Sequence, residues 1–338
     1  AMAGVRRGGA HLSAGQALFG ALPRSGQPEW LEGIATSLDR LPVAYVPVLV
    51  TCVLIGTSAA HERMGTGAVS WIGLGLSLWM TLLFATCVAH ELIHRRDKHQ
   101  ALLGHFLAGF CGYPVLEAEH LAHHGRPGDS ERGEAAAEAE PMWAFAAKRM
   151  RRIGIELLGF RAPVWRIGCR SPTLARTRAA IVTTVLTAIA FASIAGWRGL
   201  VLYFGAVLGV SFGLQLITYI QHWGLGDEAI GAGVAYGRGW EDDCRFQAWV
   251  TLSISLHDQH HQDSRRPFYR LNLSPDSPRL PTGYVLLMFA SMVPSVWRRL
   301  MHPARAHWMQ NPDSPLSAGR RLTCFGSTAP LNRTRASS

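Results

Sequence analysis

The residues with the most evident chemistry are histidines, which occur 15 times in 338 residues and recur in one pattern, His-x-x-His-His. Two copies of this pattern lie far apart in the chain. On a helix, positions i, i+3 and i+4 fall on one face, so each copy is expected to direct three imidazole rings at the same volume. A further pair has i, i+4 spacing. The histidines of the two copies and the pair are His120, His123, His124, His257, His260, His261, His90 and His94.

Bringing three groups of imidazoles together costs free energy, because buried or charged rings gain nothing from one another. A bound metal ion supplies the missing stabilisation. Eight histidines exceed the ligand number of one ion, which is about four for zinc and about five or six for other transition metals, so the count favours two ions. Imidazole suits iron, copper, zinc and nickel alike, and the spacing does not choose among them.

The segment His90-Glu91-Leu92-Ile93-His94 also matches the HExxH helix of zinc proteases. That interpretation requires only one further ligand and leaves both His-x-x-His-His copies without a role. We therefore favour a site for two metal ions over a zinc protease.

The composition is that of a membrane protein, with 48% hydrophobic and only 17% charged residues and a mean hydropathy of +0.11. Four apolar runs are each close to the roughly 20 residues that a spanning helix requires. They are expected to form two hairpins, the second closed by a short turn around Trp197 and Arg198. A fifth run is shorter and contains His105, which favours a re-entrant or interfacial helix. The runs are residues 41–60, 68–89, 179–197, 199–221 and 101–116.

The expected fold is an all-α integral membrane protein. It has about four transmembrane helices, one re-entrant or interfacial helix, and a cytoplasmic helical cap that carries the histidine clusters. Along the chain we expect a cytoplasmic N-terminal segment of residues 1–39, a membrane domain of residues 40–309, and a disordered tail of residues 310–338. The N-terminal segment is basic but lacks the apolar stretch of a secretory signal.

Positive charge gathers between the two predicted hairpins, in a segment that includes Arg95, Arg96, Lys148 and Arg149, and the net charge of the chain is +10. By the positive-inside rule this segment faces the cytoplasm. An even number of spans then places both termini and every histidine cluster on the cytoplasmic face of a bacterial-type inner membrane. Nucleic acid is not an expected partner, because no aromatic and basic recognition motif accompanies the charge.

The six cysteines show no CxxC pairing. This spacing argues against a disulfide framework, a zinc ribbon or a built-in rubredoxin. Any electrons that the site consumes must therefore come from another chain.

Several motifs follow one another in a fixed order between about residues 40 and 309. Besides the histidine clusters they are Tyr219-Ile-Gln-His222-Trp-Gly-Leu225, Leu280-Pro-Thr-Gly-Tyr284 and Pro294-Ser-Val-Trp297. In this order they resemble the integral-membrane non-haem di-iron oxygenases of the fatty acid desaturase-like superfamily. Within that family the chain is most similar to the branch of alkane 1-monooxygenase and xylene monooxygenase.

The resemblance implies nine histidine ligands, with His222 added to the eight above, and two iron ions. It implies hydroxylation of an unactivated C–H bond, at a terminal or benzylic methyl group, with O2 and two electrons from a rubredoxin or a ferredoxin-type reductase. The substrate is expected to be an apolar alkyl or alkyl-aromatic molecule or a lipid, dissolved in the membrane lipids. Spanning helices provide an apolar slot for it, and the candidate lining residues are Trp71, Trp79, Phe84 and Phe212.

Four side chains near the ligands are expected to orient histidines or tune the metals without binding them: Glu119, Asp129, Gln221 and Arg265. The sequence departs from the family at Gln221, where Glu is usual, and at Leu256 and Gln259, where Arg and Asp are usual. It also shows four spans where the family has six. Two other functions stay open: a lipid desaturase that uses the same metals, and a membrane metal carrier, which predicts ligands along a pore.

Overall fold

The structure is a computed structural model of the chain. It describes residues 20–22, 29–63, 67–125, 128–130, 135–158, 171–227, 237–274 and 277–310, so the predicted tail lies outside the described residues. Helices form nearly all of the regular structure, and no strand longer than an isolated bridge occurs in these ranges. The expected all-α class is confirmed.

Three long helices within the described ranges are apolar enough to cross a membrane: α2 (Glu32–Arg63), α3 (Ala68–Ile93) and α7 (Pro172–His222). The 51-residue α7 is a hairpin of two helices, because Ala195 and Gly196 leave helical geometry. Gly196 has φ +59°, a left-handed conformation that favours glycine. The predicted turn at Trp197 and Arg198 therefore begins two residues earlier, and three long helices carry the four predicted spans.

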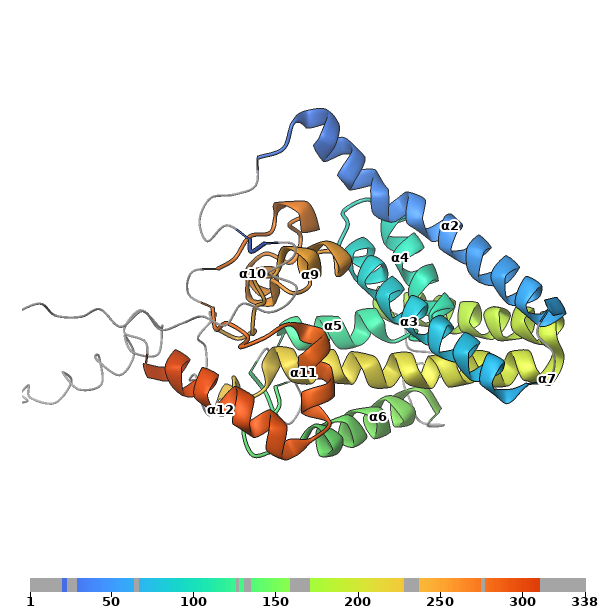
Figure 1. Cartoon of the computed structure of the whole chain (residues 1–338). Coiled ribbons are helices and arrows are strands. Elements are labelled where there is room, and N and C mark those ends of the chain that lie inside the picture. Colours follow the sequence, from blue (N-terminus) through green and yellow to red (C-terminus); the bar gives the residue numbers. More distant parts are fainter. Residues whose placement is uncertain are drawn as a thin grey trace, which may run out of the picture.

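Two aromatic rings confirm that α7 folds back on itself. Phe191 and Tyr203 are twelve residues apart, which corresponds to about 18 Å in a continuous helix. Their ring centroids are only 5.1 Å apart. Figure 1 shows the two arms of α7 running side by side, with the turn at the end of the molecule far from α10.

A short helix, α4 (Lys98–Phe110), packs against α3 and α7. Asp97 caps it, because its carboxylate accepts hydrogen bonds from the amides of His99 and Gln100 at 3.0 and 2.9 Å. Gly109 permits close packing, since a Cβ there would lie 2.4 Å from the carbonyl oxygen of Ala180. With 13 residues α4 is too short to span a membrane, which agrees with the short apolar element expected in this region.

The remaining helices gather at the end of the long helices where α3 and α7 terminate (Figure 1). A cluster of aromatic residues holds this end together: Trp223 contacts Trp297 with ring centroids 5.6 Å apart, and Tyr219 contacts Trp297 at 5.2 Å. The Leu280–Tyr284 and Pro294–Trp297 motifs thus support the end of α7. The helices are α5 (Leu116–Gly125), α6 (Met142–Leu158), α9 (Arg245–Val250), α10 (His257–Gln262), η2 (Phe268–Arg270), α11 (Tyr284–Ser291) and α12 (Pro294–Gln310).

Candidate metal centre

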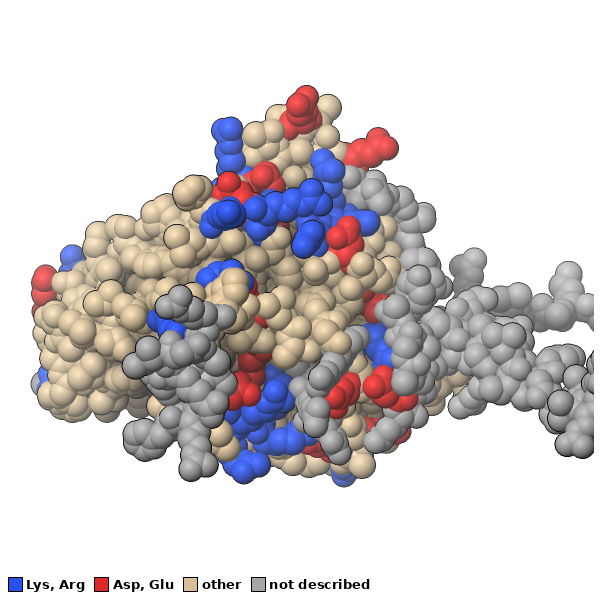
Figure 2. Space-filling view, turned by 180° about the vertical axis from the view of Figure 1, so that it is seen from behind, with Lys and Arg blue, Asp and Glu red and all other residues tan. Residues whose placement is uncertain are grey.

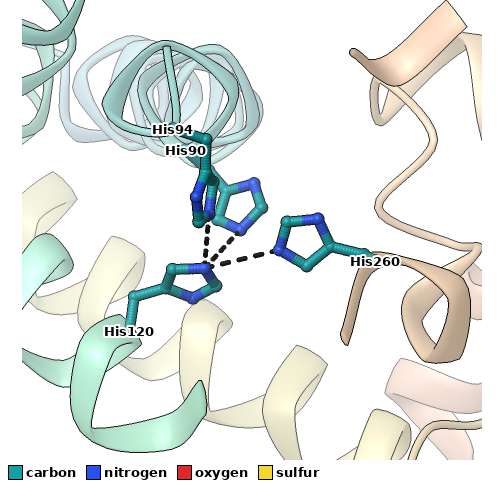
Figure 3. Close-up of side chains that lie close together, drawn as sticks. All are labelled: His90, His94, His120 and His260. Carbon is teal, nitrogen blue, oxygen red and sulfur yellow. Dashed lines mark hydrogen bonds between the residues drawn. The ribbon is translucent and has the colours of Figure 1, made fainter. Parts of the chain in front are cut away.

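Four histidines from three helices converge on one point (Figure 3). They lie close enough for their ring nitrogens to share one ion, and we call them quartet A: His90, His94, His120 and His260. His90 and His94 come from the last turns of α3, His120 from α5 and His260 from α10. The Nε2 atom of His120 lies 3.1, 2.6 and 3.4 Å from the Nε2 atoms of His90, His94 and His260, respectively.

A second group, quartet B, consists of His123, His222, His257 and His261. The Nε2 atom of His257 lies 2.8 Å from that of His222 and 3.1 Å from that of His261. The Nε2 atoms of His123 and His261 are 2.7 Å apart. His222 is the last residue of α7, so its position depends on the aromatic packing described above.

Each His-x-x-His-His segment contributes to both quartets. From α5, His120 joins quartet A and His123 joins quartet B. From α10, His257 and His261 join quartet B, and His260 joins quartet A. The expectation that each segment points all three rings at one volume was therefore wrong. The i and i+4 rings of a segment stay together, whereas the i+3 ring lies far enough around the helix to reach the neighbouring point.

The ninth histidine, His124, lies beside quartet A. Its Nε2 atom is 2.9 Å from that of His120 and 3.2 Å from that of His260. Its ring is also close to His261 of quartet B, with centroids 4.7 Å apart. All nine histidines implied by the family resemblance are thus brought together, and their role as ligands remains a proposal.

The distances between ring nitrogens fit coordination of an ion. Two imidazole nitrogens that each lie about 2.1 Å from one ion are about 3.0–3.4 Å apart at angles of 90–110°. The separations in both quartets run from 2.6 to 3.4 Å, so they overlap this range and extend somewhat below it. Without an ion, two such nitrogens face each other with lone pairs and can share one proton at most, so the donor set suits a metal.

The electrostatic environment keeps these rings neutral. Burial lowers the pKa of His94 to about 3 and that of His124 to about 4. For His120, His123 and His260 burial and the neighbouring imidazoles lower the pKa well below the usual 6.5. A neutral imidazole offers a free nitrogen lone pair, so at neutral pH the rings are ready to bind metal.

A buried carboxylate, which the sequence analysis did not select, fixes the orientation of His222. The Nδ1 atom of His222 is 2.7 Å from the carbonyl oxygen of Arg238, which directs Nε2 at quartet B. The amides of Gly237 and Arg238 in turn donate to the Asp258 carboxylate at 3.1 and 2.8 Å. Asp258 is fully buried and lies inside the second histidine segment. This position in the segment was the signal that could have identified it.

Glu241 plays the same structural part for α10. Its carboxylate is fully buried and accepts hydrogen bonds from the amides of Gln259 and Ser274 at 3.1 and 3.0 Å. Arg279 pairs with it at 2.6 Å. Burial raises the pKa of Glu241 to about 7, with Arg279 acting in the opposite direction. Nothing in the sequence pattern distinguished this residue from the other acidic residues.

The four residues expected to assist the ligands have different surroundings. Glu119 is paired with Arg149 at 3.2 Å and accepts a hydrogen bond from Tyr113, and neither of these partners is a histidine. Gln221 donates to the carbonyl oxygen of Ile254 at 3.3 Å. Arg265 is exposed and close enough to His94 to lower its pKa further. Asp129 is half-buried just after α5. Their influence on the ligands stays a prediction.

A small cavity of about 90 Å³ adjoins the histidines. Histidines of both quartets form one end of its wall, and residues of α3 and α7 continue it away from them. A second, larger cavity of about 620 Å³ lies further along the same two helices. Trp71, Trp79 and Phe212 line this outer cavity, as expected for the apolar slot, whereas Phe84 is not among its lining residues.

Comparison with known proteins identifies the class. The chain matches the family model of fatty acid desaturases over residues 68–273. It is 26% identical to alkane 1-monooxygenase 1 of Pseudomonas aeruginosa, over 79% of this chain and 72% of that protein. It is 24% identical to alkane 1-monooxygenase 2 of the same organism, over 79% and 74% of the two chains. With the xylene/toluene monooxygenase hydroxylase component of Pseudomonas putida it shares 24% identity, over 72% and 67%.

The chain belongs to the fatty acid desaturase family, because the match covers more than half of its length. Within the family it groups with the membrane monooxygenases, so the resemblance drawn from the motifs is confirmed. Within the part of the chain that the structure describes, the candidate ligands gather in two quartets rather than along the length of the spanning helices, unlike the ligand-lined pore expected of a metal carrier.

Glu119 lines the cavity beside His120 and His123 and pairs with Arg149, which is only 5% exposed. Glu119→Gln removes the charge from this pair, so it is expected to lower the melting temperature. Because the changed group lies in the cavity wall beside two candidate ligands, turnover is expected to fall by about 10- to 100-fold with unchanged metal content. Glu117→Gln on the same helix is the matched control, because Glu117 pairs with Arg176 and does not line the cavity. Equal turnover rates for Glu119→Gln and the wild type would show that Glu119 does not assist the metal ligands.

Proposed function

We propose that this protein hydroxylates a terminal or benzylic methyl group of an apolar alkyl substrate, with O2 and two electrons supplied by a separate protein. The observation that carries the proposal is the cavity between the quartets and the apolar helices α3 and α7. It brings a C–H bond of a membrane-soluble molecule to a histidine-bound metal centre. The monooxygenase names of the relatives support the same reaction class.

Two iron ions are the proposed cofactor, one held by quartet A with His124 and one by quartet B. Iron in such a site supplies O2 activation when it is bound. The chain holds the nine rings in place through α3, α5, α7 and α10, and keeps them neutral by burial. Leu116, Leu214 and Ile217 in the cavity wall limit the access of water to the reacting carbon.

The shape of the cavity favours reaction at the end of a chain. Its volume of about 90 Å³ is small beside that of the outer cavity, about 620 Å³, so it accommodates only the end of a long alkyl chain. A longer alkyl chain must therefore extend along α3 toward the outer cavity, and only its last carbons reach the histidines. Burial of each methylene group contributes about 0.8 kcal/mol to binding.

We also propose the orientation given by the charge pattern, in which both quartets and both termini face the cytoplasm of a bacterial-type inner membrane. The histidine-bearing ends of α3 and α7 and the helices α5 and α10 occupy one side of the molecule (Figure 1). This common side agrees with the prediction from helix parity. Rubredoxin or a ferredoxin-type reductase is the proposed donor.

Product analysis tests the proposal. Membranes that contain the protein are supplied with a reduced rubredoxin and its reductase, and with linear alkanes, alkylbenzenes and fatty acyl lipids. We expect a primary or benzylic alcohol as the main product, with label from ¹⁸O2 in the hydroxyl group. Alkenes as the main product would assign the chain to the desaturases, and oxygen derived from labelled water would exclude an oxygenase.

A further inference from the structure

A surface groove of about 660 Å³ lies between the first turns of α2 and the segment that follows the second histidine segment. Two aromatic, two cationic and two acidic side chains line it: Trp30, Tyr269, Arg40, Arg270, Glu32 and Asp39. One of the acidic residues, Asp39, is paired with Arg95. The indole nitrogen of Trp30 donates to the carbonyl oxygen of Tyr269 at 2.8 Å, which ties the two walls together. Trp30 is still 44% exposed. The substrate cavities on α3 and α7 share no lining residue with this groove.

The floor of the groove is connected to quartet A through the end of α3. Asp39 in the groove pairs with Arg95, the residue after His94, and Arg95 pairs with Glu91 at 2.8 Å. The carboxylate of Glu91, the residue after His90, accepts a hydrogen bond from the amide of Phe268 at 3.4 Å. A short path of covalent bonds, ion pairs and hydrogen bonds thus connects a partner bound in the groove to the rings of His90 and His94.

Exposed cations lie in the groove and near quartet A. Among the described residues, Arg40 and Arg270 of the groove and Arg265 beside His94 are exposed and form no ion pair. Arg265 acts electrostatically on His94, and Arg270 on Tyr269, so these charges lie near quartet A and the groove. Figure 2 shows Lys and Arg side chains in a row across the upper part of the molecule, with fewer acidic side chains among them.

The proposed reaction consumes electrons that the chain does not hold. It converts RH, O2, two electrons and two protons into ROH and water, and the described residues contain no cysteine pair arranged to carry electrons. Exposed aromatic residues beside arginines are typical of protein interfaces. Basic surfaces also attract acidic partners and orient them before contact.

We propose that this groove, with the arginines around it, is the docking site of a small acidic electron-transfer protein. This inference rests on the proposed oxygenase function. The partner docks twice in each turnover and transfers one electron each time, so two reduced carriers become oxidised while one O2 is reduced. Trp30 and Tyr269 supply the apolar contact, and Arg40 and Arg270 bind carboxylates of the partner.

The test uses the full-length protein and a labelled acidic rubredoxin. The variant Arg40→Glu with Arg270→Glu is compared with Arg151→Glu and Arg299→Glu, a control that changes the same charge at exposed arginines of α6 and α12. We expect the groove variant to weaken rubredoxin binding and to raise the KM for rubredoxin by at least about ten-fold, with weaker dependence on salt. Iron content, kcat at saturating rubredoxin and anaerobic reduction by dithionite are expected to remain unchanged.

Trp30→Ala is expected to weaken binding of the rubredoxin without reducing the effect of salt, because it removes apolar contact and no charge. The proposal would be overturned if the groove variant and the control variant lost rubredoxin affinity to the same extent. Unchanged rubredoxin binding in the groove variant would overturn it too. If the groove variant instead loses activity only in vesicles that contain anionic lipid, and binds rubredoxin normally, the groove would be assigned to a lipid headgroup. If rubredoxin binding is lost in the groove variant while the wild type forms no hydroxylated product, docking stands and the proposed oxygenase function fails.

Discussion

His123→Ala and His260→Ala are each expected to remove one of two iron ions, and to lower turnover by more than 100-fold. His123 belongs to quartet B and His260 to quartet A, so each substitution removes one of four convergent rings from a different ion. Loss of a residue that only orients a ligand already costs 10- to 100-fold, and loss of a ligand is expected to cost more. Metal analysis of the purified variants gives the ratio of iron to protein.

The double variant distinguishes two independent sites from one shared site. With one ion per quartet, His123→Ala and His260→Ala combined should hold almost no iron, whereas each single variant should hold about one ion per chain. His99→Ala is the control, because His99 is exposed and outside both quartets. Full iron content in both single variants, or one zinc ion per wild-type chain, would contradict the assignment.

The architecture could be predicted from the sequence because its causes are local. Spanning helices need about 20 apolar residues, and the apolar runs show this directly. The turn within α7 was placed two residues late, since its cause is a single left-handed residue, Gly196, rather than the polar Arg198. Helix α2 begins at Glu32, before the predicted apolar run at residue 41 and within the segment assigned to the N-terminal region, because helical geometry continues beyond the apolar stretch.

The division of the histidines between two points could not be predicted from spacing. Positions i and i+3 share one face of a helix, yet they differ by about 60° around its axis. Whether His120 and His123 meet at one ion or two depends on where α3, α7 and α10 place the other rings. The supporting carboxylate of Glu241 was missed for the same reason, because its partners are backbone amides far away in the sequence.

Leu83 is expected to control which chain lengths the enzyme accepts. On α3 it lies one turn from Trp79, which lines the outer cavity, and about one turn from Thr86, which lines the cavity at the quartets. Leu83 is buried and packs against α7 at Gly213, where a Cβ would lie 2.8 Å from its side chain. Positions 79, 83 and 86 share one face of α3, so we expect the Leu83 side chain to stand between the two cavities.

Leu83→Ala is expected to join the cavities and to raise the ratio of kcat/KM for long over short alkanes by about ten-fold, and Leu83→Phe to lower it by a similar factor. The reason is that each methylene group that gains or loses a place in the apolar slot changes binding by about 0.8 kcal/mol, or about four-fold. Competition between pairs of alkanes of different length in one reaction measures the ratio directly.

Leu82→Ala is the matched control, because it removes the same atoms from an equally buried position that lines neither cavity. It should lower stability without changing the ratio, and the same shift in both alanine variants would show that loosened packing, not the passage, sets the chain length.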